Sequence, residues 1–512
     1  MRGFRSRLAA SLGWLLGGGV LFLCYVRISR TQPANSDGAA NVLQASGMLH
    51  GNLLLHGWWL SDVSFYTTEL PEYVLVDWIR GASPDVIHVA AGLTYTILIV
   101  LAGLLAKGRA TGKEAIARIL IATGIMLAPQ PGNAVSTLLL APDHLGSAAP
   151  VLLLFLLVDR ARPRWYVPVL AGLLLTLALI ADPLVLITGV LPVVAVCGWR
   201  ACSGIARREQ ARSAWLDLTL IGAAVAAAGA SRAVLAWISL RGGFTTARVT
   251  TAPVTFALLR QNLAAIPRGL LLLYGAGFPG QGTGAAIALA VLHLAGLALA
   301  AWALGSAVRW FRPAADRVDQ LLVTAVLANL VATALLIQAA AYGSDREYAA
   351  VLPFGAVLAA RILGPRIAAS ARLAAVLAVL LAGYVLALVS AMTVPAVPAY
   401  DARLTPWLTA HHLSYGIASY WNASIVTLSS GQRIHVVSWK AKNGQFLVHR
   451  WEAERSWYSP RRHDADFAVF RARQPGVRHL AVARFGPPSR VYRLGRDFVV
   501  LVWHENLLQK LR

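Results

Sequence analysis

Ionisable side chains that stand beside long apolar runs are the residues of this sequence most able to do chemistry. Asp37 follows the first apolar run, an Asp-His pair at 143–144 precedes another, and Asp-Arg-Glu-Tyr at 345–348 precedes a late one. A carboxylate or a histidine can accept a proton as a general base, and an arginine binds phosphate through two parallel hydrogen bonds. The candidates for one polar site are Asp37, Asp62, Glu69, Asp143, His144, Arg346 and Tyr348.

The composition places these residues in a membrane protein. Of the 512 residues, 57% are hydrophobic and 13% are charged, and the mean hydropathy is +0.60. Soluble domains are about 45–50% apolar and about 25% charged, so a water-soluble enzyme of this length is excluded. A net charge of +23 on a soluble chain would suggest nucleic acid as a partner. Here the basic residues lie mostly between apolar runs and in the C-terminal part, which predicts a lipid bilayer and no nucleic acid.

The apolar runs predict a polytopic α-helical membrane protein with about eleven transmembrane helices. About 20 apolar residues cross a bilayer as a helix, and shorter helices survive inside a bundle. Residues 264–278 are also apolar, but Arg268 and several glycines favour an interfacial or re-entrant segment there. The predicted spans are 8–26, 86–106, 116–130, 147–158, 167–181, 184–198, 214–238, 284–307, 320–342, 349–362 and 373–392.

The distribution of Lys and Arg predicts the orientation of these spans. Cytoplasmic loops carry an excess of both residues. With the N-terminus in the cytoplasm, the loops on that side hold 20 Lys and Arg, whereas the loops on the other side hold 8 although they are longer. An odd number of spans then places residues 393–512 outside the cytoplasm, together with the candidate site residues.

The first outer loop, residues 27–85, is long and acidic. After Asp37 the apolar spacing predicts an amphipathic helix that lies along the membrane interface, where Trp58, Trp59 and Trp78 would join the aromatic belt. This helix would begin close to Asp37, so the carboxylate of Asp37 could serve only as its N-cap. Capping and catalysis are both open for this residue.

Residues 393–512 predict a small α/β or mostly β domain outside the membrane. Alternating apolar residues at 434–441, 445–452, 466–473, 479–485 and 497–503 are typical of strands. Tryptophan, glutamate and arginine at 451–459 suit the lining of a sugar-binding groove, although such residues more often form the core and surface of a small domain. The predicted domains are therefore a transmembrane module, 1–392, and this soluble domain.

The whole chain resembles the GT-C glycosyltransferases, integral membrane enzymes that use polyprenyl-phosphate-linked sugars outside the cytoplasm. Four features carry the resemblance: Asp37 in a large outer loop after the first span, Pro-Asp-His-Leu-Gly at 142–146 before a span, Asp-Arg-Glu-Tyr at 345–348 ahead of a span that contains Pro353, and an outer domain after the last span. The composition is also similar to that of proteins from high-GC actinomycetes.

The resemblance implies an inverting transfer of a sugar from a polyprenyl-phosphate donor to a glycan, lipid or protein of the cell envelope. Asp37 would be the general base or would help to position a metal, and Arg346 would bind the donor phosphate. His144, Tyr348 and Asp143 would assist, and Asp62 or Glu69 would supply a second carboxylate. Many members carry a paired acidic motif, and Asp37 has no acidic neighbour within two residues. The need for a divalent metal, Mg²⁺ or Mn²⁺, is therefore open.

Two other functions remain open from the sequence. A transporter or flippase of a lipid-linked saccharide would need polar groups at mid-depth in the membrane. The charged residues cluster near one face instead, which favours chemistry on that side. A non-catalytic assembly factor with a GT-C-like fold is the third option, because the paired acidic motif is missing.

Overall fold

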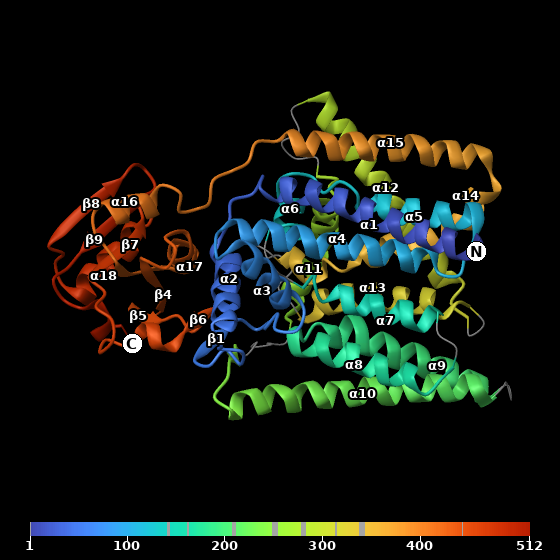
Figure 1. Ribbon diagram of the computed structural model, residues 1–512, viewed down its shortest axis with the longest axis horizontal. Coiled ribbons are helices and arrows are strands. Elements are labelled where there is room, and N and C mark those ends of the chain that lie inside the picture. The colour runs from blue at the N-terminus through green and yellow to red at the C-terminus, as the bar shows by residue number, and fades with distance from the viewer. Residues whose placement is uncertain are drawn as a thin grey trace.

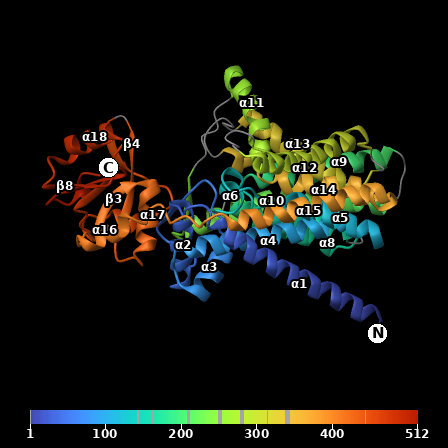
Figure 2. The same ribbon diagram turned by 90° about the horizontal axis from the view of Figure 1, so that it is seen from above.

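A computed structural model describes residues 2–140, 144–160, 163–206, 211–247, 254–277, 283–312, 315–336, 344–442 and 444–511. Long helices lie side by side and form a bundle, and a smaller domain with strands lies beyond one end of it (Figure 1). The N-terminus lies at the opposite end of the bundle. Figure 2 shows that α11 (Phe256–Leu273), which carries Pro267, projects from the bundle on the side of that domain.

The bundle has the length and apolar character of a multi-pass membrane protein. Apolar side chains such as Leu15 and Val379, which are 73% and 72% exposed, cover its outer surface and suit contact with lipid. Among the described residues, eight helices are long and apolar enough to cross a bilayer: α1 (Arg2–Ser29), α4 (Asp85–Lys107), α9 (Leu191–Ala206) with the preceding η1 (Leu186–Val190), α10 (Ala211–Leu240), α12 (Gly284–Arg309), α13 (Arg317–Leu336), α14 (Val351–Ala369) and α15 (Ala371–Thr393).

Three further predicted spans correspond to shorter helices. These are α5 (Gly112–Met126), α7 (Ala148–Arg160) and α8 (Tyr166–Ala181). The polytopic helical fold is confirmed, whereas the number eleven stays a prediction. The helix α11 is not among the eight long apolar helices of the described residues.

A buried arginine ties four helices together at the end of the bundle where the N-terminus lies. The guanidinium of Arg361 in α14 lies 2.5 Å from Asp319, 2.8 Å from Asp316 and 3.3 Å from Asp159 of α7. It also donates a hydrogen bond to the carbonyl of Leu105 in α4. Its side chain is only 5% exposed, so the opposite charges replace the water that the guanidinium has lost.

Arg361→Met is expected to destabilise the protein by about 3–5 kcal/mol, because it leaves buried carboxylates without their cation. The measurement is thermal unfolding of the detergent-purified protein. Arg366→Met on the same helix is the matched control, since Arg366 is exposed and only stacks on Trp302. Equal melting temperatures for the two variants would contradict a stabilising role for Arg361.

The first loop packs between the bundle and the C-terminal domain, and its predicted place along the membrane interface stays a prediction. It contains α2 (Ser36–Leu49), β1 (Trp58–Leu60) and α3 (Glu69–Arg80). All residues of α2 from 36 to 46 except Asp37 are buried, because α3 covers one face of the helix and α17 (Tyr420–Ser429) covers another. The prediction that Trp58 joins the aromatic belt is wrong, because Trp58 is buried against Trp457, with ring centroids 5.2 Å apart. Trp78 is 74% exposed, as a residue of the aromatic belt would be.

The C-terminal domain is built on a six-stranded mixed sheet with the order β5-β4-β3-β7-β9-β8. Strand β3 runs parallel to β4 and β7, and the remaining neighbours are antiparallel. The elements of this domain are α16 (Leu404–Ala410), β3 (Tyr415–Ser419), α17, β4 (His435–Lys442), β5 (Gln445–Val448), β6 (Ala453–Glu454), η3 (Arg455–Tyr458), β7 (Phe467–Arg471), α18 (Pro475–Phe485), β8 (Arg490–Leu494), β9 (Phe498–Val502) and η4 (Leu507–Gln509).

The strand predicted at 479–485 is wrong, because this segment is the second half of α18. Pro475 begins the helix, and Gly486, with a φ of +91°, ends it. Ala481 and Phe485 are buried one helical turn apart, which is the spacing that a helix uses to face a core.

A small second sheet joins the C-terminal domain to the bundle. Its central strand, β1, pairs in parallel with β2 (Thr245–Thr246), which follows α10, and antiparallel with β6 of the C-terminal domain. Arg450 also stacks on Trp59, with 5.4 Å between its guanidinium carbon and the ring centroid. Segments from three distant parts of the sequence therefore meet at the end of the bundle.

Candidate active site

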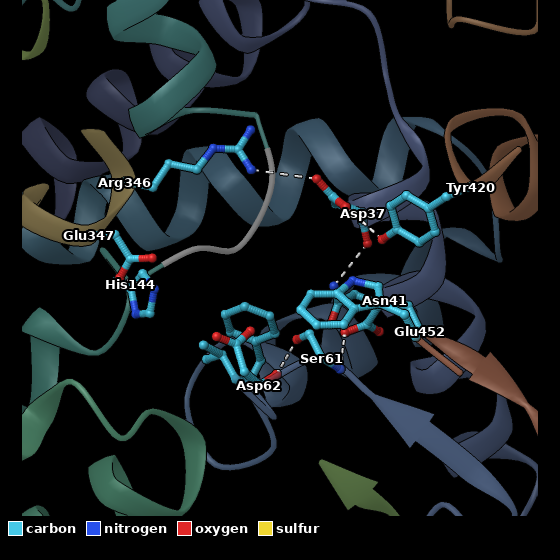
Figure 3. Close-up of a pocket in the computed structure, with 12 residues that line it drawn as sticks. Asp37, Asn41, Ser61, Asp62, His144, Arg346, Glu347, Tyr420 and Glu452 are labelled. Carbon is cyan, nitrogen blue, oxygen red and sulfur yellow. Dashed lines mark hydrogen bonds and ion pairs between the residues drawn. The ribbon is translucent and has the colours of Figure 1, made fainter. Parts of the chain in front are cut away.

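A cavity of about 280 Å³ lies where the first loop, the bundle and the C-terminal domain meet. Figure 3 shows its polar side chains arranged around an open centre. The residues that line it are Asp37, Asn41, Ser61, Asp62, Val63, Phe65, His144, Arg346, Glu347, Tyr420, Trp451 and Glu452.

Asp37 is held at the start of α2. The N-cap is Asn35, whose side-chain oxygen accepts a hydrogen bond of 3.1 Å from the backbone N–H of Gly38. The alternative that Asp37 caps this helix is therefore wrong, and its carboxylate is available to the cavity. A side chain at position 38 would collide with Ile87 of α4, since a Cβ there would lie 2.6 Å from the Cγ2 of Ile87. The close packing of α2 on α4 fixes the position of Asp37.

The carboxylate of Asp37 contacts two partners from distant parts of the chain (Figure 3). The hydroxyl of Tyr420 donates a hydrogen bond of 2.6 Å to Oδ1, and Nη1 of Arg346 lies 3.5 Å from Oδ2. Burial and the charge of Asp37 raise the pKa of Tyr420 well above its usual range, so this hydroxyl stays protonated and acts as a donor. Asp37 thus lies between a cation of the bundle and a hydroxyl of the C-terminal domain.

His144 bridges two carboxylates at the opposite side of the cavity. Its Nδ1 lies 2.9 Å from Asp182, and its Nε2 lies 2.9 Å from Glu347. Burial works against a charged imidazole, but the two carboxylates outweigh it and raise the pKa of His144 well above its usual range. Asp182 itself accepts hydrogen bonds from the hydroxyl of Ser147 and the backbone N–H of Leu184, which fix its carboxylate.

Two further carboxyl groups line the cavity. Glu452 accepts a hydrogen bond of 2.9 Å from the backbone N–H of Ser61 and another from the side-chain amide of Gln44. Burial raises its pKa to about 7. Burial also raises the pKa of Asp62, although the nearby His144 partly offsets this effect. Asp62 lines the same cavity as Asp37, and Glu452 adds another carboxyl group. The role of Asp62 as a second carboxylate stays a prediction.

Not all candidate residues reach the cavity. Glu69 is buried against Gly146, and Tyr348 is buried against Gly269 of α11, so neither side chain lines it. Asp143 lies outside the residues that the structure describes. The structure brings together Asp37, Asp62, His144 and Arg346.

Sequence reasoning missed several residues of this cavity. Asn41 lies one turn after Asp37, a spacing that a predicted helix makes visible. Trp451 and Glu452 belong to the aromatic and acidic segment that suggested a groove. Tyr420 gave no signal, because it lies 383 residues from its partner Asp37.

The buried carboxyl group of Glu69 makes the stability of the protein depend on pH. Burial raises its pKa from 4.5 to about 8. Between these values the folded chain holds a proton that the unfolded chain releases, so the free energy of unfolding falls as the pH rises from 4.5 to about 8. Glu69→Gln removes this titration and is expected to stabilise the protein by about 1–3 kcal/mol at pH 8 and by less at pH 5.

The measurement is the melting temperature of wild type and Glu69→Gln across this pH range. Glu505→Gln is the matched control, because the side chain of Glu505 is 67% exposed. A variant with the same pH slope as wild type would show that Glu69 is already ionised in the folded protein.

The described residues of the cavity do not form the ligand set of a divalent metal. Among the described residues, no group of three or more His, Cys, Asp or Glu side chains has the arrangement of a metal site. Asp37 and His144 are also already engaged by Arg346, Asp182 and Glu347. We therefore derive no chemical step through Mg²⁺ or Mn²⁺.

No family model matches this sequence, nor does any curated protein. Among solved structures, ArnT from Cupriavidus metallidurans in the apo state is similar over 98% of this chain and 99% of its own, with a TM-score of 0.53 and 14% identity. An oligosaccharyltransferase from Archaeoglobus fulgidus, solved with zinc and sulfate, matches 91% of this chain and 69% of its own, with a TM-score of 0.49 and 14% identity.

The match to ArnT extends over both the bundle and the C-terminal domain. This protein shares the fold of ArnT, in agreement with the GT-C-like fold that the sequence resemblance implied. At 14% identity the likeness shows the fold alone. Evidence for the reaction therefore comes from the cavity of this chain. The actinobacterial source of the protein stays a prediction.

Proposed function

We propose that this protein is a membrane glycosyltransferase that transfers a sugar from a polyprenyl-phosphate donor to a hydroxyl group of a cell-envelope glycan, lipid or protein. One observation supports this most: Asp37 and Arg346, 309 positions apart in the sequence, meet in a polar cavity at the end of an apolar bundle. A base and a phosphate-binding cation are the two groups that such a transfer needs.

Asp37 acts as the general base in this proposal. The acceptor hydroxyl donates a hydrogen bond to the carboxylate and loses its proton to it as the hydroxyl oxygen attacks the anomeric carbon. The bond between that carbon and the phosphate oxygen breaks, so the configuration at the anomeric carbon inverts. The hydrogen bond from Tyr420 holds the carboxylate in place while this happens.

Arg346 binds the donor phosphate and offsets the negative charge that grows on it as the bond breaks. In the absence of donor, the guanidinium pairs with Asp37 at 3.5 Å. The phosphate replaces Asp37 as the partner of Arg346, which leaves the second carboxylate oxygen of Asp37 for the acceptor. A phosphate is a good leaving group without a proton, so a second acid is not required.

The cavity and the C-terminal domain lie outside the cytoplasm in this proposal, and the N-terminus lies inside. Residues from four of the predicted cytoplasmic segments, Arg109, Asp159, Arg317 and Arg361, line a separate cavity of about 350 Å³. Because cytoplasmic ends carry the excess of Lys and Arg, this end is the cytoplasmic one. The candidate active site lies at the other end, where lipid-linked donors and envelope acceptors meet.

The test uses the full-length protein in liposomes with labelled polyprenyl-phosphate sugars and an envelope extract as acceptor. A glycosyltransferase moves the label to the acceptor, and Asp37→Asn lowers the rate of this transfer by about 10²–10⁴-fold. Movement of intact donor between leaflets, unchanged in Asp37→Asn, would identify a transporter or flippase instead. If wild type does neither, the protein is an assembly factor with this fold.

A further inference from the structure

The cavity presents many hydrogen-bond acceptors and few free donors. Among the described residues that line it, four are carboxylic acids and two, Arg346 and His144, carry a basic group. Both ring nitrogens of His144 are already engaged by Asp182 and Glu347. The hydroxyl of Tyr420 is likewise used by Asp37. A ligand that fills this space must therefore bring donors of its own.

Asn41 gives independent support for this requirement. The residue is 2% exposed, and its side-chain N–H donates to the backbone carbonyl of Asp37. Its side-chain oxygen Oδ1 is buried and has no hydrogen-bond partner among the described residues. A buried acceptor without a partner is costly, and Asn41 lines the cavity. A donor from a bound ligand would satisfy it.

The arrangement of the groups separates two parts of the cavity. Figure 3 shows Arg346 beside Asp37 at one edge, and Asp62, Glu347 and Glu452 around the remaining sides of the open centre. If the donor phosphate binds at Arg346, the sugar that it carries extends into this centre. The carboxyl groups then surround the sugar and not the phosphate.

We propose that this acceptor-rich centre is the subsite for the transferred sugar, and that it selects a sugar with hydroxyl or amino groups and no negative charge. Hydroxyl and amino groups donate to Asp62, Glu452 and Asn41. A uronic acid would place its own carboxylate beside the carboxyl groups of Asp62, Glu347 and Glu452. Burial already raises the pKa of Asp62 and Glu452, because this partly desolvated space disfavours negative charge, and it disfavours a further carboxylate for the same reason. This inference rests on the proposed function and adds the class of sugar.

The test compares three ligands that share one polyprenyl chain: polyprenyl phosphate, polyprenyl-phosphate glucose and polyprenyl-phosphate glucuronate. The two sugars differ only at C6, which is a neutral hydroxymethyl group in glucose and a carboxylate in glucuronate. We expect the purified full-length protein to bind the glucose donor about tenfold more tightly than the glucuronate donor, because only the latter meets like charge. Equal affinities, or tighter binding of glucuronate, would overturn the proposal.

Two neutralising variants locate the selection. Asp62→Asn and Glu452→Gln are each expected to narrow the difference in affinity between the glucose donor and the glucuronate donor. The affinity for polyprenyl phosphate alone is expected to stay as in wild type, which shows that the variant is folded. Asp497→Asn, an exposed change in the C-terminal domain, leaves the difference unchanged. An undiminished preference in both cavity variants would show that these carboxyl groups do not contact the sugar.

The same ligands separate this proposal from the proposed function. Arg346→Ala is expected to weaken the binding of all three ligands by the same factor, since each carries the phosphate. If it weakens the binding of none, Arg346 does not bind the donor phosphate, and the role that the proposed function gives to Arg346 fails. If it weakens all three but wild type does not distinguish the two sugars, only the proposal about the sugar fails.

Discussion

Asp37→Asn is expected to lower the rate of sugar transfer by about 10²–10⁴-fold, because a positioned general base contributes about that factor. The asparagine keeps the size of the side chain and can still accept the hydrogen bond of 2.6 Å from Tyr420. It cannot take a proton from the acceptor. The measurement is the single-turnover rate with labelled donor and acceptor, so that binding and chemistry are separated.

The expected effect of Asp37→Asn falls on chemistry and not on folding or donor binding. The melting temperature should equal that of wild type, since Asn35 and not Asp37 caps α2. Membrane abundance and affinity for polyprenyl phosphate should stay within a few-fold of wild type. Asp497→Asn is the matched control, because this exposed aspartate lies outside the cavity. Full activity of Asp37→Asn would remove Asp37 from the mechanism.

Arg346→Ala is expected to weaken binding of the polyprenyl-phosphate donor by about 100-fold, or ~3 kcal/mol, because a charge-assisted contact to phosphate in a partly buried site is lost. The side chain of Arg346 is 22% exposed, so water screens the contact only in part. Arg346→Lys should recover part of the affinity, because lysine keeps the charge but not the two parallel hydrogen bonds.

Donor affinity is measured with polyprenyl phosphate and the purified protein over a range of salt concentrations. Arg268→Ala is the control, since Arg268 is an exposed arginine of α11 that does not line the cavity. Equal donor affinity in Arg346→Ala and Arg268→Ala would move the phosphate site elsewhere. A loss of rate without a loss of affinity would instead assign Arg346 to the orientation of Asp37.

The contacts of Asp37 also make the C-terminal domain part of the candidate site. Tyr420 and Glu452 come from this domain, and β6 joins it to β1 of the first loop. The C-terminal domain therefore completes the cavity that contains Asp37.

The membrane class, most of the helices and part of the candidate site were predictable from the sequence. Hydropathy and charge are local properties that add up along a segment, so runs of apolar residues identify the spans. Asp37, Asp62, His144 and Arg346 were recognisable because each stands at a boundary between apolar and polar sequence. The prediction of a strand at 479–485 was wrong, because a short apolar run fits both the helical period of 3.6 residues and the strand period of two.

Only the tertiary structure decided which of these residues share one cavity and what surrounds them. Asn35 caps α2 where Asp37 was a candidate, Glu69 and Tyr348 turn into the packed interior, and Tyr420 and Glu452 enter from a domain hundreds of residues away. The sequence by itself determined whether each segment prefers lipid or water, because that preference depends on the side chains of the segment alone. Partners across the cavity depend on how distant segments pack, and such packing leaves no periodic trace in either segment.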